Sequence, residues 1–311
     1  MVSIYCTEDG VLREVDAVTP GAWVDLCAPT EEELAHIGAT LSIDTDLLRA
    51  ALDEEERSRI DSEDGHMLII VDTPTVEMQS GRGYTYTTIP FGIILTENNI
   101  VTVCLKESAL ARAFSETPVR NFSTKKQRRM TLQLLYRNAT LFLYYLREVD
   151  KASSRVENEL HISMKNKELI QMLGLEKSLV YFSTSLKGNE LVLERLARME
   201  FVSRYPEDAE LLEDVIIENK QAIEMSNIYR DILSGTMDAF ASVISNNLNI
   251  VMKVLASVTI ILTIPSIIFG LWGTNVPVPL ENSPLGFLVV ILIAVGLTAV
   301  SVLLMIKKGW L

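Results

Sequence analysis

The sequence predicts an α/β domain, followed by a long helical stalk that continues into a hairpin of two transmembrane helices. The chain has 311 residues, of which 48% are hydrophobic, and a formal net charge of −13. Charge and hydrophobic residues are separated along it, because only three charged residues follow Lys253. In addition, no proline occurs between Pro206 and Pro265, which permits a single helix of roughly 60 residues, about 85 Å long. An acidic, water-soluble body attached to a membrane segment satisfies all three observations.

The α/β domain is expected over residues 1–125, where short β-like runs alternate with helical stretches. The β-like runs cover residues 67–73, 89–95 and 100–104, and the helical stretches cover 31–37 and 44–52. The chain begins without the apolar segment of a secretory signal. Its three cysteines, Cys6, Cys27 and Cys104, are widely spaced. Free thiols in a reducing compartment are therefore expected, which indicates a cytosolic domain.

Residues 126–250 are expected to form a second cytosolic region that is helical and includes the stalk. A basic and polar stretch at 121–130 is interpreted either as a linker or as the start of a helix. From Thr131 onward the hydrophobic pattern is helical, and residues 157–196 fit amphipathic helices.

Two uncharged stretches near the end of the chain are long enough to cross a bilayer as helices. The first transmembrane helix is expected at 251–272, an external loop at 273–284, the second transmembrane helix at 285–306 and a tail at 307–311. Lys253 flanks the first helix and Lys307 and Lys308 follow the second, whereas the loop contains no Lys or Arg. The positive-inside rule then predicts a multi-pass protein of the cell membrane (plasma or inner membrane), in contact with lipid and with both termini in the cytosol.

One face of the first transmembrane helix is built from polar or small residues, with one methionine. Counted in alternating steps of three and four residues, this stripe consists of Asn249, Met252, Ala256, Thr259, Thr263, Ser266 and Gly270. Two helices from one chain cannot enclose a water-filled path, so conduction along the stripe requires several copies around an axis. Small polar residues are equally typical of packing between membrane helices, and the stripe by itself leaves both interpretations open.

The same stepping continues the stripe back along the stalk, through Asp238, Asp231 and Asp214. Carboxylates along the seam of a coiled coil repel one another, so they indicate either an aqueous axis or cations bound between neighbouring copies. The alternative is that each carboxylate simply faces solvent.

The acidic composition also excludes some classes of function. A sequence-independent nucleic-acid binder needs a basic surface, so no nucleic-acid partner is expected, and divalent cations are the natural partners of the acidic body. No motif for nucleotide binding or hydrolytic catalysis occurs in a usable context, and the three histidines, His36, His66 and His161, are isolated. We therefore expect neither an enzyme nor a nucleotide partner.

The residues that close the first transmembrane helix, Gly273-Thr274-Asn275 after Gly270-Leu271-Trp272, resemble the CorA family of divalent-cation channels and transporters. In that family the helix ends in an aromatic residue followed by Gly-Met-Asn. Other segments agree in order and spacing. Residues 249–255 resemble the family's Asn-x-x-Met-Lys-x-Leu start of the pore helix, 307–311 resemble its basic tail, and 23–26, 29–33 and 52–57 fit its cytosolic domain. The resemblance covers most of the chain.

The resemblance implies a homopentameric funnel with a ring of Asn275 side chains at the outer mouth of a pore. Gly273, Thr274 and Asn275 are then the selectivity filter, which holds hydrated Mg2+ through neutral oxygens. Met252 and Leu255 match the apolar collar at which the family closes by constriction and dewetting. Packing of the helix bundle is the alternative role of these two residues.

Two features depart from the family pattern. Thr274 replaces the central methionine, and because a hydroxyl and a thioether differ in packing and hydrogen bonding, the loop is expected to be looser or aimed differently. Family members associated with zinc also vary at this position, so Zn2+ or Co2+ is the alternative cation to Mg2+. The loop also lacks the family's Met-Pro-Glu-Leu segment, and Glu281 and Asn282 are expected to attract cations instead.

Asp214 matches the stalk aspartate at which the family binds regulatory Mg2+ between protomers. The position of its usual carboxylate partner is Ala50 here, preceded by Arg49, so the site is expected to be altered or rebuilt with Asp53 or Glu54. The candidate metal ligands of the body are Asp53, Asp214, Asp231 and Asp238. A membrane-anchored cation sensor or scaffold that does not conduct is the alternative from a different class of function.

Overall fold

The computed structural model describes residues 1–8, 11–79, 83–116, 122–163, 166–199, 201–202, 205–280 and 283–310. The chain divides into two compact units, Met1–Gly235 and Thr236–Leu311. The first unit contains a β-sheet and its covering helices. The second contains the C-terminal part of helix α6 (Pro206–Trp272) and helix α7 (Gly286–Lys307).

The first unit is built on a seven-stranded sheet with the strand order β2-β1-β3-β7-β6-β5-β4. The strands are β1 (Val2–Glu8), β2 (Val11–Glu14), β3 (Trp23–Cys27), β4 (Arg59–Glu63), β5 (His66–Gln79), β6 (Gly83–Leu95) and β7 (Ile100–Cys104). Among the described strands, β3 and β7 pair in parallel and the other neighbours pair antiparallel. β3 lies inside the sheet, between β1 and β7, which explains why both faces of this strand contribute buried residues.

The sequence pattern correctly predicted the first half of β5, the second half of β6 and all of β7, but it missed the other four strands and the full length of β5 and β6. β2, for example, has no buried residue and two charged side chains, so it offers no apolar run. β5 extends to Gln79 because it pairs with β6 along its whole length, from Met67 opposite Leu95 to Gln79 opposite Gly83. Pairing between strands, rather than an apolar pattern, determines these lengths.

One face of the sheet is covered by two short helices, α1 (Glu31–Leu41) and α2 (Thr45–Ala50). Thr30 and Glu33 form a capping box at the start of α1, and Asp44 caps α2. Leu34 and Leu48 from these helices pack in one core cluster with strand residues such as Val24, Leu68 and Val101. The helices predicted at 31–37 and 44–52 are therefore confirmed, with shifted ends.

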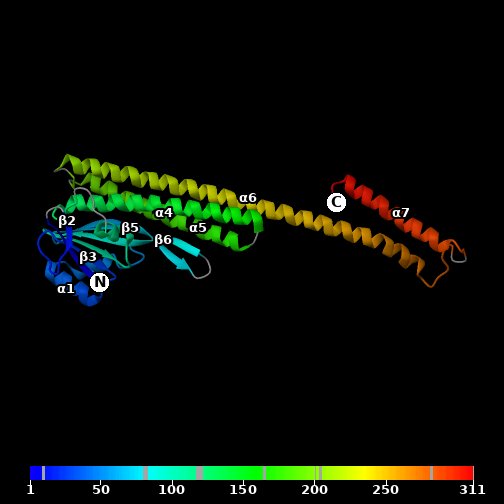
Figure 1. Cartoon of the computed structure of the whole chain (residues 1–311), viewed down its shortest axis with the longest axis horizontal. Helices are drawn as coiled ribbons and strands as arrows, with labels where there is room; N and C mark the ends of the chain where they lie inside the picture. The colour runs from blue at the N-terminus through cyan, green and yellow to red at the C-terminus, as the bar shows by residue number, and fades with distance from the viewer. Residues whose placement is uncertain are drawn as a thin grey trace. The chain divides into compact units, whose positions relative to one another are not determined.

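The opposite face of the sheet is covered by α3 (Ala109–Glu116), α4 (Gln127–Ser163) and α5 (Asn166–Arg198). Figure 1 shows α4 and α5 on this side. Their apolar faces enclose a second core cluster with the sheet, in which Trp23 and Phe91 meet Leu132 and Val192. Because α4 begins at Gln127, the basic stretch 121–130 contains the start of a helix.

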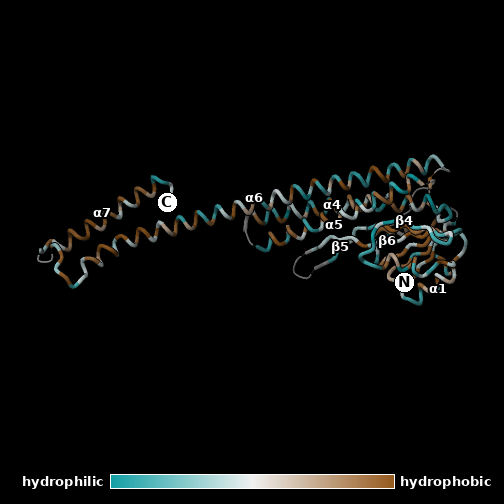
Figure 2. The backbone as a smooth tube through the Cα atoms, turned by 180° about the vertical axis from the view of Figure 1, so that it is seen from behind, coloured by the Kyte–Doolittle hydropathy of each residue, from teal (hydrophilic) through white to brown (hydrophobic). Residues whose placement is uncertain are grey.

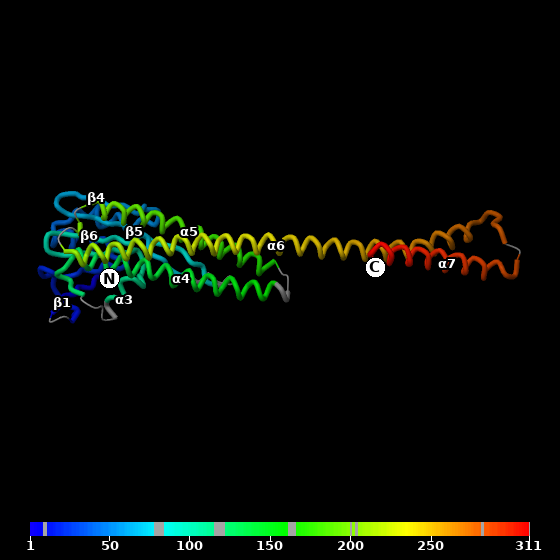
Figure 3. The backbone as a smooth tube through the Cα atoms, turned by 90° about the horizontal axis from the view of Figure 1, so that it is seen from above, coloured from blue at the N-terminus to red at the C-terminus, as the bar shows by residue number. Residues whose placement is uncertain are grey.

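Helix α6 is a single helix of 67 residues, so it is about 100 Å long. It continues through Pro265 to Trp272, the residue at which the first transmembrane helix was expected to end. In the first unit one face of α6 is buried at Leu212, Val215, Asn219, Ala222, Ser226 and Leu233. Asn219 donates to the Leu186 carbonyl of α5 at 3.1 Å and Ser226 to that of Leu179 at 3.0 Å. Polar side chains thus attach α6 to α5, which lies alongside it (Figures 1 and 3).

In the second unit, hydrophobic residues dominate α7 and the C-terminal part of α6, as Figure 2 shows. Both helices are long and apolar enough to cross a membrane. Most of their large apolar side chains are exposed in the single chain, which is the arrangement that lipid or neighbouring helices require.

Candidate cation pathway

The face of α6 that packs against α7 is apolar and separate from the predicted stripe. Ile268 of α6 forms a buried cluster with Val290 and Ala294 of α7, and Ile264 and Trp272 pack against it. The hairpin therefore packs through one defined face of α6, spaced by three or four residues as a helix face requires.

Every residue of the predicted stripe is exposed in the single chain. The exposed residues are Asn249, Met252, Ala256, Thr259, Thr263, Ser266 and Gly270. Leu255, next to the stripe, is 58% exposed, whereas Ser257 is completely buried. The stripe thus takes no part in packing within the hairpin, and it stays available for an axis or for other copies of the chain.

The hydroxyl groups of the stripe are oriented by bonds to the helix backbone. Thr259 donates to the Leu255 carbonyl at 2.8 Å, Thr263 to the Thr259 carbonyl at 2.7 Å and Ser266 to the Leu262 carbonyl at 2.8 Å. Each hydroxyl proton is used in this way, so the lone pairs of the oxygen remain as acceptors. Acceptors of this kind suit the waters around a hydrated cation, because coordinated waters are hydrogen-bond donors.

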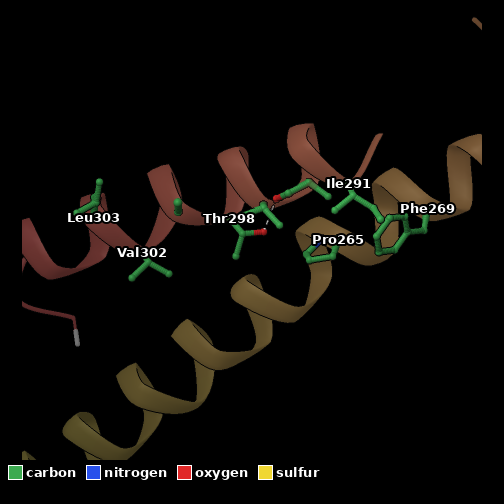
Figure 4. Close-up of a pocket in the computed structure, with 9 residues that line it drawn as sticks. Pro265, Phe269, Ile291, Thr298, Val302 and Leu303 are labelled. Atoms are coloured by element: carbon green, nitrogen blue, oxygen red, sulfur yellow. Dashed lines mark hydrogen bonds between the residues drawn. The ribbon is translucent and has the colours of Figure 1, made fainter. Parts of the chain in front are cut away.

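Pro265 interrupts the hydrogen bonds of α6, because proline has no N–H to offer the carbonyl of Ile261. An apolar groove of about 610 Å³ lies beside it, between α6 and α7. Figure 4 shows Pro265 and Phe269 of α6 at this groove, with Ile291 and Thr298 of α7 opposite them. The Thr298 hydroxyl donates to the Ala294 carbonyl at 2.7 Å. Apart from Thr298, the residues that line the groove have apolar side chains.

Among the described residues, hydrogen bonds from Gly273, Thr274 and Trp272 hold the end of α6 and the loop that follows it. The Gly273 amide donates to the Phe269 carbonyl at 2.9 Å, and the Thr274 hydroxyl donates to the Leu271 carbonyl at 2.8 Å. The indole Nε1 of Trp272 donates to the Pro279 carbonyl at 3.1 Å and so spans the loop. Asn275 is exposed in this loop.

Two of the predicted loop residues, Glu281 and Asn282, lie outside the described residues. The role of Trp272 as a hydrogen-bond donor to the loop was missed by the sequence analysis, which used this residue only as a marker of the helix end. A tryptophan followed by a proline-rich loop was the available signal, but which carbonyl the indole reaches depends on the folded loop.

The predicted carboxylates of the stalk, Asp214, Asp231 and Asp238, are all exposed on α6. Asp231 pairs with the neighbouring Arg230 at 3.0 Å. These three carboxylates lie on a different side of α6 from the residues that are buried against α5. We call this exposed side of α6 the seam, and it continues along the helix into the stripe.

The predicted partner site near α2 is occupied by local interactions. Asp53 is exposed and accepts a hydrogen bond from the Glu55 amide at 3.0 Å, which forms a turn. Arg49 pairs with Glu31 at 2.7 Å and with Asp46 at 3.1 Å. Among the described residues, one chain brings together no group of three or more His, Cys, Asp or Glu side chains that would hold a metal. The structure of one chain therefore does not assemble the four predicted metal ligands into one site.

These features define a class of membrane protein in which a water-soluble α/β domain continues, through one long helix, into an apolar helical hairpin. Comparison with known families assigns the chain within this class. It belongs to the CorA family, because the model described as "CorA-like Mg2+ transporter protein" matches residues 21–308.

Individual relatives agree with this assignment. The chain is 31% identical over 304 residues to the cobalt/magnesium transport protein CorA of Methanocaldococcus jannaschii, covering 93% of this chain and 91% of the relative. It is 27% identical over 172 residues to the protein of the same description from Thermotoga maritima, covering 55% and 49% of the two chains. The complete structure of the CorA magnesium transporter from M. jannaschii superposes with a TM-score of 0.86 at 26% identity, covering 100% of this chain and 99% of that chain.

The resemblance found in the sequence is thereby confirmed, and so is the predicted fold of an α/β domain, a long helix and two apolar C-terminal helices. The protein is a CorA-like membrane transporter of divalent cations.

Proposed function

We propose that this protein is a homopentameric channel that moves hydrated Mg2+ along the exposed seam of α6 toward a ring of five Asn275 side chains. One observation supports this most directly. The stripe from Asn249 to Gly270 is exposed at every position, while a different face of the same helix packs on α7. Several copies arranged around an axis would place the stripe at the centre.

The chemistry of the stripe suits a cation that keeps its waters. Mg2+ loses its hydration shell reluctantly, so neutral oxygens that accept hydrogen bonds from coordinated water hold it without stripping it. Thr259, Thr263 and Ser266 have acceptor lone pairs available in this way. Asn275 adds an exposed amide oxygen at the end of the helix.

Zn2+ is the weaker alternative, because it favours nitrogen and sulfur ligands. Every histidine and cysteine of the sequence precedes residue 162, so residues 236–311 contain neither. Co2+ remains a second candidate, because two relatives are described as cobalt/magnesium transport proteins.

The proposed topology places the membrane crossings at 251–272 and 285–306, the loop 273–284 outside and both termini in the cytosol. Lys253, Lys307 and Lys308 support this orientation. The stalk acids Asp214 and Asp238 then lie in the cytosolic part of the seam, where bound Mg2+ would offset repulsion between copies.

Uptake of cations into proteoliposomes tests the proposal. Wild-type protein is expected to take up Mg2+, and Asn275→Ala is expected to reduce uptake at least about tenfold, equal to ~1.4 kcal/mol. Val276→Ala is the matched control, because it truncates an exposed apolar side chain of the same loop, which is 63% exposed. Hexaamminecobalt(III), whose ligands do not exchange, should block the wild type if the filter recognises a hydrated cation.

Three outcomes would contradict the proposal. Equal uptake by Asn275→Ala and the wild type would show that Asn275 does not form the filter. A dimer in native mass spectrometry would exclude a pentameric pore. A pentamer that transports no cation at all would instead support the sensor or scaffold alternative.

A further inference from the structure

Thr274 makes a hydrogen bond that the methionine of the family motif cannot make. Its hydroxyl donates to the Leu271 carbonyl at 2.8 Å. This carbonyl belongs to the last turn of α6, where the backbone has no N–H partner further along the helix. A thioether sulfur has no proton to donate, so methionine at this position would leave the carbonyl to water.

The segment around Thr274 is anchored at two further points. Trp272 donates from its indole to the Pro279 carbonyl at 3.1 Å, and Trp272 also packs against the cluster between α6 and α7. At the other end of the loop the backbone of Leu280 lies directly against Gly286, where an added Cβ would collide with the Leu280 carbonyl oxygen. The loop therefore has fixed ends, and the Thr274 bond secures the residue just before Asn275.

We propose that Thr274 is a positioning residue for the cation filter, whose hydroxyl holds the backbone next to Asn275 so that its amide oxygen meets the hydrated cation in one orientation. This inference rests on the proposed function of Asn275. It reverses the expectation from sequence, in which threonine was expected to loosen or re-aim the loop. The specificity that follows is for a cation with an intact octahedral water shell, because a fixed ring of acceptors matches one spacing of donor waters.

The hydrogen bond also weakens a competing ligand. Because the Leu271 carbonyl accepts the Thr274 proton, one of its two lone pairs is occupied and less of this oxygen is available near the filter. A carbonyl released by substitution would be a new acceptor for water or for a partly dehydrated cation. Loss of the hydroxyl should therefore weaken recognition of the hydrated ion.

The test compares three substitutions at one position with a matched control elsewhere. Thr274→Val keeps the shape and removes the hydroxyl, Thr274→Ser keeps the hydroxyl, and Thr274→Met restores the family residue. The control is Thr298→Val, because Thr298 makes an equivalent bond to the Ala294 carbonyl at 2.7 Å on α7, away from the loop. Each variant is measured in proteoliposomes for the KM and maximal rate of Mg2+ uptake and for inhibition by hexaamminecobalt(III).

We expect Thr274→Val and Thr274→Met to raise the KM for Mg2+ and the inhibition constant of hexaamminecobalt(III) about fivefold, equal to ~1 kcal/mol, with a maximal rate within about twofold of the wild type. Thr274→Ser and Thr298→Val should behave as the wild type. If Thr274 had only a structural role, its substitution would lower the amount of pentamer or the maximal rate and leave the KM and the inhibition constant unchanged. That result would overturn the inference.

Equal constants for Thr274→Val, Thr274→Met and the wild type would also overturn it. Should Thr274→Val fail to assemble in native mass spectrometry, Thr274→Met provides the same comparison. Asn275→Ala separates this inference from the proposed function. If Asn275→Ala is inactive while Thr274→Val and Thr274→Met match the wild type, only the positioning role of Thr274 is wrong. If Asn275→Ala takes up Mg2+ as the wild type does, the proposed filter at Asn275 is wrong.

Discussion

Thr102 of β7 donates its hydroxyl proton to Oδ1 of Asp25 on β3, with 2.6 Å between the two oxygens. The indole of Trp23 donates to the same Thr102 hydroxyl at 2.8 Å. Burial disfavours the charged carboxylate and raises the pKa of Asp25 to about 6, although the hydrogen bond from Thr102 acts in the opposite direction. A carboxyl group with a pKa near neutrality is thus placed inside the α/β body.

This pKa predicts a pH dependence of stability. The folded state holds the proton of Asp25 up to about pH 6, whereas an unfolded chain releases it near its ordinary value of 3.8. The free energy of unfolding contributed by Asp25 therefore falls as pH rises from about 4 to about 6, by on the order of 3 kcal/mol. Asp25→Asn should remove this loss and raise the urea midpoint at about pH 7.5 more than at about pH 5, as measured by circular dichroism.

Thr102→Val is expected to change the stability at high pH in the opposite direction to Asp25→Asn. Without the Thr102 hydroxyl, the ionised carboxylate of Asp25 loses its donor, so this variant should be destabilised more at about pH 7.5 than at about pH 5. A wild type and an Asp25→Asn variant whose urea midpoints differ equally at both pH values would show that Asp25 does not titrate in this range.

The stripe on α6 predicts an effect on transport that depends on which face of the helix is changed. Thr263→Val removes an exposed oxygen acceptor while preserving shape, and Mg2+ uptake should fall about fivefold. Ser257→Ala is the control on the buried face. The Ser257 hydroxyl is buried without a hydrogen-bond partner among the described residues, so its removal should leave uptake unchanged and stability equal or slightly higher. Equal effects of both changes would argue against a polar path along the stripe.

The stalk seam predicts that Mg2+ orders the cytosolic part of α6. Hydrogen exchange of stalk amides should be slower in Mg2+ than in EDTA, because the cation offsets repulsion between carboxylates of neighbouring copies. Asp214→Asn should reduce this difference by about half or more. Glu213→Gln removes the same charge from the adjacent residue, which is exposed but off the seam, and should match the wild type. Identical exchange in Mg2+ and EDTA for the wild type would refute a regulatory cation on the stalk.

Two glycines of α7 predict contrasting effects of alanine. A Cβ at Gly286 would collide with the carbonyl oxygen of Leu280, whereas nothing lies within 4 Å of a Cβ at Gly296. Gly286→Ala should therefore displace the loop and lower the stability of the purified protein by about 1–3 kcal/mol. Gly296→Ala should be neutral or stabilise by up to ~1 kcal/mol through helix propensity. Thermal unfolding of the two variants decides between these expectations, and a greater loss for Gly296→Ala would show that α7 is packed against another helix there.

Much of α6 could be predicted because its features are local. The absence of proline between Pro206 and Pro265 permitted one long helix, and the steps of three and four residues identified the exposed seam through Asp214 and Thr263. The sheet was predicted less completely. Strand β3, which pairs with the central strand β7, was missed, because a run of five residues such as Trp23–Cys27 has no distinctive period until its neighbours pair with it.

The amino-acid sequence alone determined the family, the order of soluble and apolar segments and the residues that share the stripe on α6, because these follow from composition and from the fixed rise and turn of a helix. The tertiary structure decided which face of α6 packs on α7, which carbonyls Thr274 and Trp272 reach, and that Asp25 lies beside Thr102. Such contacts depend on how the chain pairs and closes in space, so no local pattern of side chains encodes them individually.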